Sequence, residues 1–154
     1  MDLTKDKYII VEIIPDHSNP KYGKICQIQA LKLHGLTLID RFDYRLNKDK
    51  IDNIAIIKAI DYDNDSFSYV FDSDTMLNDF KDWVLDYPLI IIEDSYTLNY
   101  LSKIDNKKEI IYPYLNLEHS YDVIDKIISK YNLQPSNHIV DLIYEAIIYE
   151  SNNK

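Results

Sequence analysis

Glycine, cysteine and long apolar runs are scarce in this sequence, and each shortage excludes a class of protein. Only two glycines occur in 154 residues, so a glycine-rich phosphate loop and a dinucleotide-binding fingerprint are both excluded. The single cysteine, Cys26, excludes an intrachain disulfide framework and agrees with a reducing cytoplasm. No apolar stretch approaches the roughly 20 residues that cross a bilayer, and the first residues lack the apolar core of a signal peptide. We therefore expect a cytoplasmic protein that makes no use of a membrane.

Basic residues are also few relative to acids. Lysine and arginine together number 17 against 26 aspartates and glutamates, which leaves a net charge of −9. Sequence-independent binding to nucleic acid draws most of its affinity from lysines and arginines that neutralise phosphates. The lysines here are interleaved with acids, a pattern typical of an ordinary solvated surface. The composition therefore argues against a broad basic surface, although it does not exclude a local basic groove.

Apolar runs dominate the first part of the chain. Tyr8–Ile14 and Ile25–Leu33 have the texture of strands, and a turn at His34 and Gly35 leads into a third run, Leu36–Leu46. The hydrophobic content of 46% fits a packed globule, and the length predicts one domain over residues 1–154. The first run carries a lone acid, Glu12, which needs a partner, water or a shifted pKa if its strand is buried.

The rest of the chain alternates between helical and strand-like segments. A polar connection over Asp61–Ser73 precedes a helix that Ser73 or Asp74 is expected to cap. Leu89–Ile92 is continuously apolar, which is typical of a buried parallel strand. The capped helix is expected to present Leu77, Phe80, Trp83 and Val84 on one face. Further helices are expected at Ile51–Ile60, Tyr96–Ile104, Ser120–Tyr131 and about Asn137–Glu150, and Ile110–Leu117 stays undecided because Pro113 argues against a central strand. This order predicts an α/β fold with a mixed sheet.

Four segments of the chain resemble the DEDDh family of proofreading 3′–5′ exonucleases, which have a ribonuclease-H-like fold. They are Lys24–Leu33, Asp40–Phe42, Leu89–Leu101 and Val123–Leu133, in which Asn132 stands where the family often has a left-handed glycine. The resemblance implies a mixed sheet of about five strands in the order 3-2-1-4-5, with helices on both faces. It also implies that Tyr8–Ile14 is central and that Leu89–Ile92 lies parallel beside it.

The family's chemistry uses four acids that hold two divalent ions, together with a histidine as general base. Carried onto this chain, the first pair of acids falls on Glu12 and Ile14, the next on Thr97 and the last on Asp141. The resemblance therefore leaves Glu12 and Asp141 as candidate metal ligands. Two carboxylates are too few for a two-metal site, so no resident cofactor is expected, and an active enzyme would require Mg²⁺ or Mn²⁺.

The remaining candidates lie beside the family's positions and not on them. The histidine position falls on Ser136, and His138 could act as the base only if the last helix started elsewhere. Asp94, next to Glu93, comes just before the second motif's helix and could act as a displaced ligand.

Three hypotheses about function follow from these features. The first is an exonuclease-like domain that has lost catalysis and acts as a binding or interaction module in nucleic-acid metabolism. The second is a residual metal-dependent 3′–5′ exonuclease. The third, based on the charge and the acidic Asp61–Asp65 segment, is an acidic protein that mimics nucleic acid or binds a basic partner. The expected partners are accordingly single-stranded nucleic acid or another protein.

Overall fold

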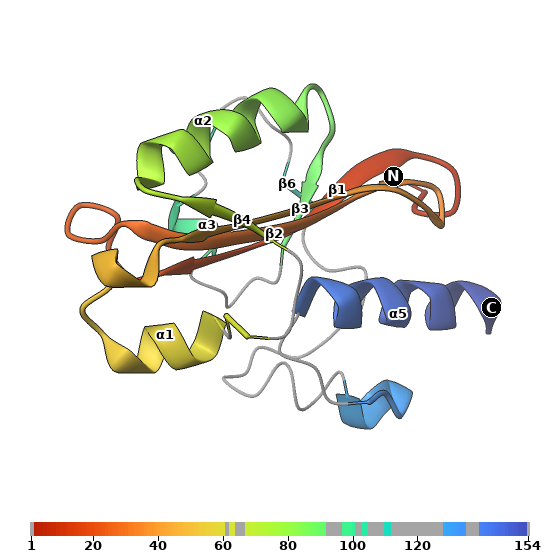
Figure 1. Cartoon of the computed structure of the whole chain (residues 1–154). Coiled ribbons are helices and arrows are strands. Elements are labelled where there is room, and N and C mark those ends of the chain that lie inside the picture. Colours follow the sequence, from red (N-terminus) through yellow and green to blue (C-terminus); the bar gives the residue numbers. More distant parts are fainter. Residues whose placement is uncertain are drawn as a thin grey trace.

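A mixed β-sheet with helices on both faces organises the chain (Figure 1). The computed structural model describes residues 2–60, 62–63, 67–91, 97–100, 103–104, 110–111, 128–134 and 139–153. Across the sheet, the strands are β4 (Ser68–Val70), β3 (Thr37–Leu46), β2 (Ile25–His34), β1 (Lys7–Pro15), β5 (Leu89–Ile90) and β6 (Ile110–Ile111). The helical elements are η1 (Lys48–Lys50), α1 (Ile54–Ile60), α2 (Ser73–Val84), α3 (Thr97–Tyr100) and α5 (Ile139–Asn152), and residues 128–131 are also helical.

Strand β2 is antiparallel to both of its neighbours, whereas the pairs β1–β5, β5–β6 and β3–β4 are parallel. Five strands follow the predicted order, with β1 inside the sheet and β5 parallel beside it. The expectation of about five strands omitted β4, which lies within the segment predicted as a polar connection. Ser68 and Tyr69 are exposed, so this short edge strand lacks the apolar pattern of a covered one.

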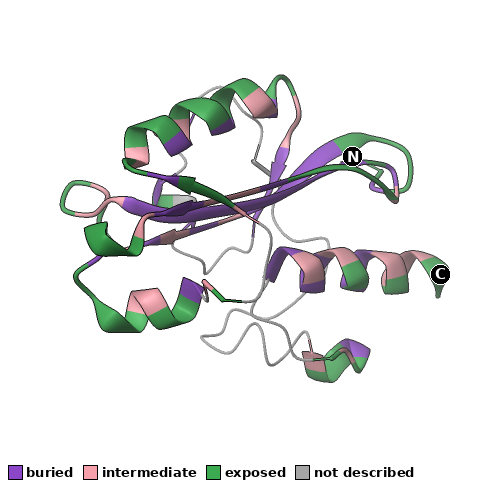
Figure 2. Ribbon diagram, in the orientation of Figure 1, coloured by how far each residue is buried: buried purple, intermediate pink, exposed green. Residues whose placement is uncertain are grey.

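Two apolar cores lie on opposite faces of the sheet. On one face, Ile9 and Val11 of β1 belong to the same buried cluster as Phe80 of α2. On the other face, Tyr8 and Ile10 belong to a cluster with α5. Successive residues of a strand point to opposite faces, so a strand covered on both sides reads as a continuous apolar run. Figure 2 shows the resulting buried sheet between partly exposed helices.

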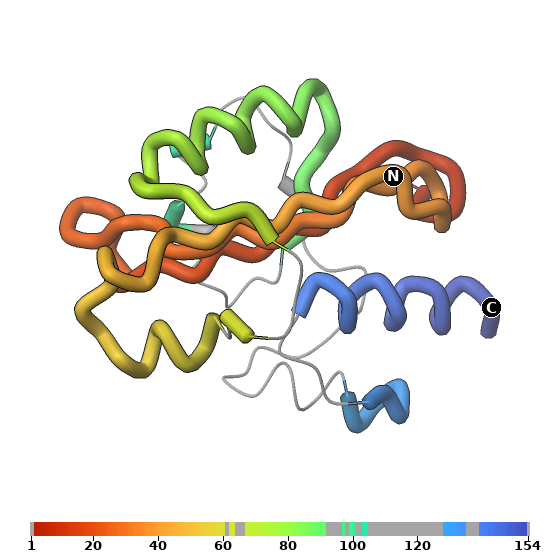
Figure 3. The backbone as a smooth tube through the Cα atoms, viewed as in Figure 1, coloured from red at the N-terminus to blue at the C-terminus, as the bar shows by residue number. Residues whose placement is uncertain are grey.

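The turn between β2 and β3 depends on Gly35 and on the chain's first residues. Gly35 has a φ of 59°, and a Cβ placed there would lie 2.5 Å from the Thr4 carbonyl oxygen. Its N–H donates to the Asp6 carbonyl (2.8 Å), and its carbonyl accepts from the Tyr8 hydroxyl (2.9 Å). The N-terminal segment therefore packs against this hairpin, as the tube in Figure 3 shows.

The N-cap of helix α2 comes before both of the residues that were expected to cap it. Asp72 is the N-cap, because its carboxylate accepts from the Thr75 N–H at 2.7 Å. Neither Ser73 nor Asp74 has this role, so the predicted cap was wrong. The Ser73 hydroxyl donates instead to the Ile25 carbonyl of β2 (2.7 Å), which ties the start of the helix to the sheet.

The residue that follows α2 has a strained backbone. Leu85 has a φ of 54° and a ψ of −127°, a region that glycine adopts far more readily than leucine. Its side chain is 63% exposed, so removing it loses little packing. We expect Leu85→Gly to raise the free energy of unfolding by about 1 kcal/mol, measured by urea denaturation. Leu38→Gly, at an exposed strand position, should lower it. A loss of stability in both variants would contradict the strain argument.

Other predicted elements are described only in part. Asn132 has a φ of 51°, as expected for the residue in the place of a left-handed glycine. The undecided segment contains strand β6, and the helix predicted over Ser120–Tyr131 is described only at 128–131. Cys26 is buried, and burial raises the pKa of its thiol to about 12, which agrees with an inert core residue. None of the helices in the described ranges is long and apolar enough to cross a membrane.

Candidate functional site

A row of polar side chains crosses three strands on one face of the sheet. Glu12 of β1 lies opposite Gln29 of β2, which lies opposite Asp43 of β3. Gln27 and Arg45 form the next cross-strand pair. Because side chains alternate along each strand, these five residues share the face covered by α1 and α5. Gln27, Gln29 and Arg45 are buried, so polar groups occupy the interior here, where an apolar core would otherwise continue.

Arg45 and Asp43 form the centre of this polar row. The Arg45 side chain is 0% exposed, and its Nε and Nη2 atoms donate to the two carboxylate oxygens of Asp43 at 3.0 and 2.8 Å. Nη1 donates to the Ile60 carbonyl (3.3 Å), and the guanidinium lies 4.0 Å from the centroid of the Phe67 ring. Gln27 Nε2 adds a hydrogen bond to Asp43 (3.1 Å). The arrangement satisfies a buried charge and thereby joins β2, β3 and α1.

Glu12 is half-buried at the other end of the row. Burial raises the pKa of its carboxyl to about 8, because the ionised form loses hydration. Within the described part of the chain, no hydrogen bond or ion pair reaches this carboxyl. At neutral pH this raised pKa favours the protonated form of Glu12 when no metal is bound. A cation that binds there has to displace that proton.

Thr97 lies at the start of α3 and is completely buried. Its hydroxyl accepts a hydrogen bond from the backbone N–H of Ile13 (2.8 Å), the residue that follows Glu12. The position that the resemblance assigned to a metal-binding acid thus lies against β1, beside the first candidate ligand. A threonine there supplies a structural hydrogen bond and no negative charge.

Asp141 lies in the first turn of α5 and contacts β3. The Arg41 guanidinium donates to both of its carboxylate oxygens, with Nη1–Oδ2 at 3.2 Å and Nη2–Oδ1 at 2.8 Å. Arg41 thereby neutralises the Asp141 carboxylate through the planar two-bond contact that a guanidinium makes with a carboxylate.

The other predicted site residues cannot be placed. His138, Asp94, Glu93 and Ser136 lie outside the described residues. Among the residues that are described, no group of three or more His, Cys, Asp or Glu side chains is arranged to hold a metal ion. Of the two candidate ligands that can be placed, Glu12 has a carboxyl pKa raised by burial and Asp141 is paired with Arg41.

The polar row itself was not predicted. Ile25–Leu33 was interpreted as an apolar run, although Gln27 and Gln29 recur within it at a spacing of two. Asp43 and Arg45 have the same spacing on the next strand. This alternation was the available signal, since residues two apart in a strand share a face.

Comparison with known proteins identifies no family for this chain. No protein-family model matches it, and no curated protein shows significant similarity to it.

Proposed function

We propose that the chain is a ribonuclease-H-like, exonuclease-like domain that has lost catalysis and acts as a binding or interaction module in nucleic-acid metabolism. The observation that carries this proposal is the Arg41–Asp141 pair, in which one guanidinium engages both oxygens of the last candidate ligand. A carboxylate held in this way has to give up two charge-assisted hydrogen bonds before it can bind Mg²⁺.

The strand arrangement supports the exonuclease-like part of the proposal. Five strands have the order and the antiparallel opening that the resemblance implies. Thr97 contacts β1 beside Glu12, where an acid of the second motif would belong. The left-handed Asn132 agrees with the same family pattern. These features are local matches distributed along the whole chain, and each depends on a different segment.

The lack of a carboxylate at two of the family's four acid positions supports the loss of catalysis. Two-metal phosphodiester hydrolysis uses one ion to generate hydroxide and both ions to stabilise the in-line transition state. Ile14 and Thr97 supply no carboxylate at two of the four acid positions. Mg²⁺ needs an octahedral set of oxygen ligands and binds weakly to isolated carboxylates. The domain would therefore retain the architecture of a nuclease and use its surface for binding.

We expect the isolated protein to release no nucleotides from 5′-labelled single-stranded DNA or RNA in millimolar Mg²⁺ or Mn²⁺. The melting temperature should shift by less than about 1 °C with either ion, because a site with a dissociation constant above the ion concentration stabilises the fold very little. Fluorescence anisotropy with the same oligonucleotides measures binding separately from cleavage.

Two variants make this experiment decisive. Metal-dependent turnover that disappears in Glu12→Ala would overturn the proposal in favour of a residual exonuclease. Stabilisation by Mn²⁺ that disappears in Asp141→Asn, but not in the exposed control Asp52→Asn, would have the same consequence. The absence of both nucleotide release and metal-dependent stabilisation supports the loss of catalysis that we propose.

A further inference from the structure

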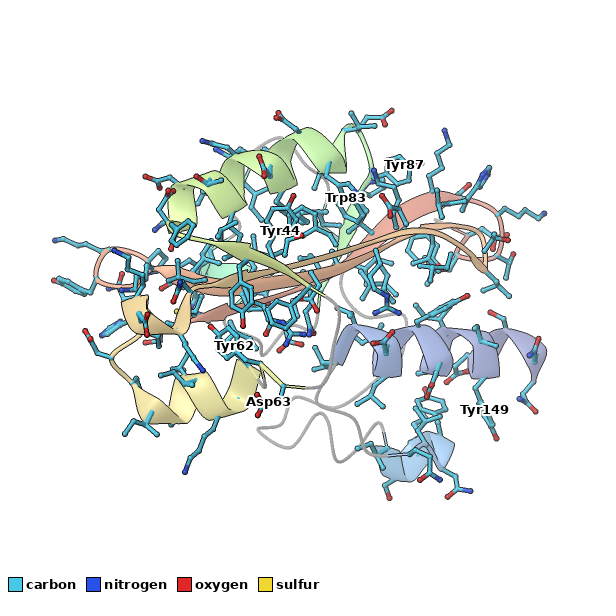
Figure 4. All side chains as sticks on the ribbon, viewed as in Figure 1. Tyr44, Tyr62, Asp63, Trp83, Tyr87 and Tyr149 are labelled. Atoms are coloured by element: carbon cyan, nitrogen blue, oxygen red, sulfur yellow. The ribbon has the colours of Figure 1, made fainter. Side chains whose placement is uncertain are left out.

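A pocket of about 350 Å³ opens between β3 and α2, on the face of the sheet opposite the polar row. Aromatic rings and carboxylates line it together: Asp40, Phe42 and Tyr44 from β3, and Asp79, Asp82 and Trp83 from α2. Asp79 and Asp82 are exposed, whereas Tyr44 and Trp83 are half-buried. Figure 4 shows Tyr44 and Trp83 on the α2 side of the sheet and Tyr62 on the other side.

The aromatic residues form a packed wall. The Phe42 and Tyr44 rings are stacked, with centroids 4.1 Å apart and planes inclined by 9°. Phe42 also contacts the rings of Phe80 (5.1 Å) and Trp83 (5.3 Å). Because Phe80 is completely buried in the core, this wall is anchored to the interior. A ligand entering the pocket therefore meets preorganised ring surfaces.

A hydrogen bond favours the charged form of the Asp40 carboxyl at the pocket. Trp83 Nε1 donates to Asp40 (2.9 Å), and this bond lowers the pKa of the Asp40 carboxyl. Arg41 also lines the pocket, but its guanidinium is bonded to Asp141 of α5, a helix on the opposite face of the sheet. Lys32 lies over the Trp83 ring, 4.3 Å from its centroid, and donates to the Trp83 carbonyl. Lys32 offsets the charge of Asp40, which leaves the charges of Asp79 and Asp82.

We propose that this pocket binds an arginine side chain presented by a basic segment of a partner protein. A guanidinium is planar, stacks on aromatic faces and donates to two carboxylates at once, so it matches both the rings and the acids. Lysine offers a compact, strongly hydrated charge that uses only the second feature. The net charge of −9 favours encounter with a basic partner.

This inference goes beyond the proposed function and does not depend on it. The pocket lies across the sheet from Glu12, and its chemistry does not involve the remnants of a metal site. A nuclease assay can therefore fail or succeed without affecting the outcome at the pocket.

Trp83 is the only tryptophan of the chain, so its fluorescence reports on the pocket directly. The probe is a fluorescein-labelled peptide with arginines alternating with serines, compared with matched peptides that carry citrulline or lysine. An unlabelled set of the same peptides serves for the Trp83 measurement. We expect saturable binding of the arginine peptide with a change in Trp83 emission, and affinity for the citrulline peptide at least about tenfold weaker.

The variants test whether the pocket or the overall charge is responsible. Asp79→Asn with Asp82→Asn should weaken binding of the arginine peptide at least about fivefold. Asp52→Asn with Glu145→Gln removes the same charge from exposed positions outside the pocket and should change affinity less than about twofold.

Any of four results would overturn the inference. Equal losses in the two double variants would mean non-specific attraction to an acidic protein. Equal affinity for the lysine peptide would exclude recognition of the guanidinium. Binding without a change in Trp83 emission, or no saturable binding at all, would place any contact away from the pocket.

Discussion

Replacing Glu12 with glutamine is expected to stabilise the protein markedly at pH 8. The pKa of the Glu12 carboxyl is about 8 in the folded chain, against an ordinary value of 4.5. Between these two values the folded state holds a proton that the unfolded state has released, so the free energy of unfolding falls as pH rises. Glutamine is neutral at every pH and avoids that loss. The expected gain for Glu12→Gln at pH 8 is on the order of 3–5 kcal/mol.

The measurement is the free energy of unfolding by urea at several pH values between 4.5 and 9. Wild type and Glu12→Gln should differ little near pH 4.5, where the carboxyl is protonated in the folded state and still half protonated in the unfolded state. The two curves should separate steadily up to pH 8 and run parallel above it. Glu145→Gln, at an exposed position of α5, is the control and should follow wild type. Parallel curves for wild type and Glu12→Gln over the whole range would mean that Glu12 ionises normally.

Replacing Asp43 with alanine is expected to lower the free energy of unfolding by about as much as Glu12→Gln raises it at pH 8. Asp43→Ala leaves the Arg45 guanidinium fully buried without its carboxylate, which destabilises a fold by about 3–5 kcal/mol. The double variant Asp43→Leu with Arg45→Met removes both charges and replaces them with apolar side chains. It should recover a large part of the loss, because much of the cost of the single variant is an uncompensated charge and not a lost attraction.

Urea denaturation of the single and double variants tests this expectation. Lys24→Ala serves as a comparison that breaks a surface ion pair. Lys24 Nζ lies 3.9 Å from Asp16 Oδ2, and both side chains are partly exposed. That substitution should cost less than about 1 kcal/mol. If the double variant were as unstable as Asp43→Ala, packing around Arg45 and its hydrogen bond to the Ile60 carbonyl would account for the effect, and the charge would not.

Structural features that depend on residues close together in the sequence could be predicted from the sequence. The continuous apolar sequences of Tyr8–Ile14 and Leu89–Ile92 predicted strands covered on both faces, and strands β1 and β5 lie side by side in parallel. The turn at Gly35 and the left-handed Asn132 follow from the few residue types that adopt a positive φ. The cap of α2 was placed wrongly, because Asp72, Ser73 and Asp74 all have suitable side chains. In the folded chain Asp72 accepts from the Thr75 N–H, whereas the Ser73 hydroxyl donates to the Ile25 carbonyl.

Apart from the short edge strand β4, the sequence by itself determined which of the described segments form strands and helices, because hydrophobic periodicity and turn chemistry act over a few residues. The tertiary structure alone decided which charged groups lie next to one another. Arg41 and Asp141 are 100 residues apart in the chain and meet only because α5 packs on the sheet. Asp40 and Asp79 come to the same pocket from a strand and a helix. Such pairings depend on distances across the fold, and charges in a sequence carry no record of which partner lies within a few ångströms.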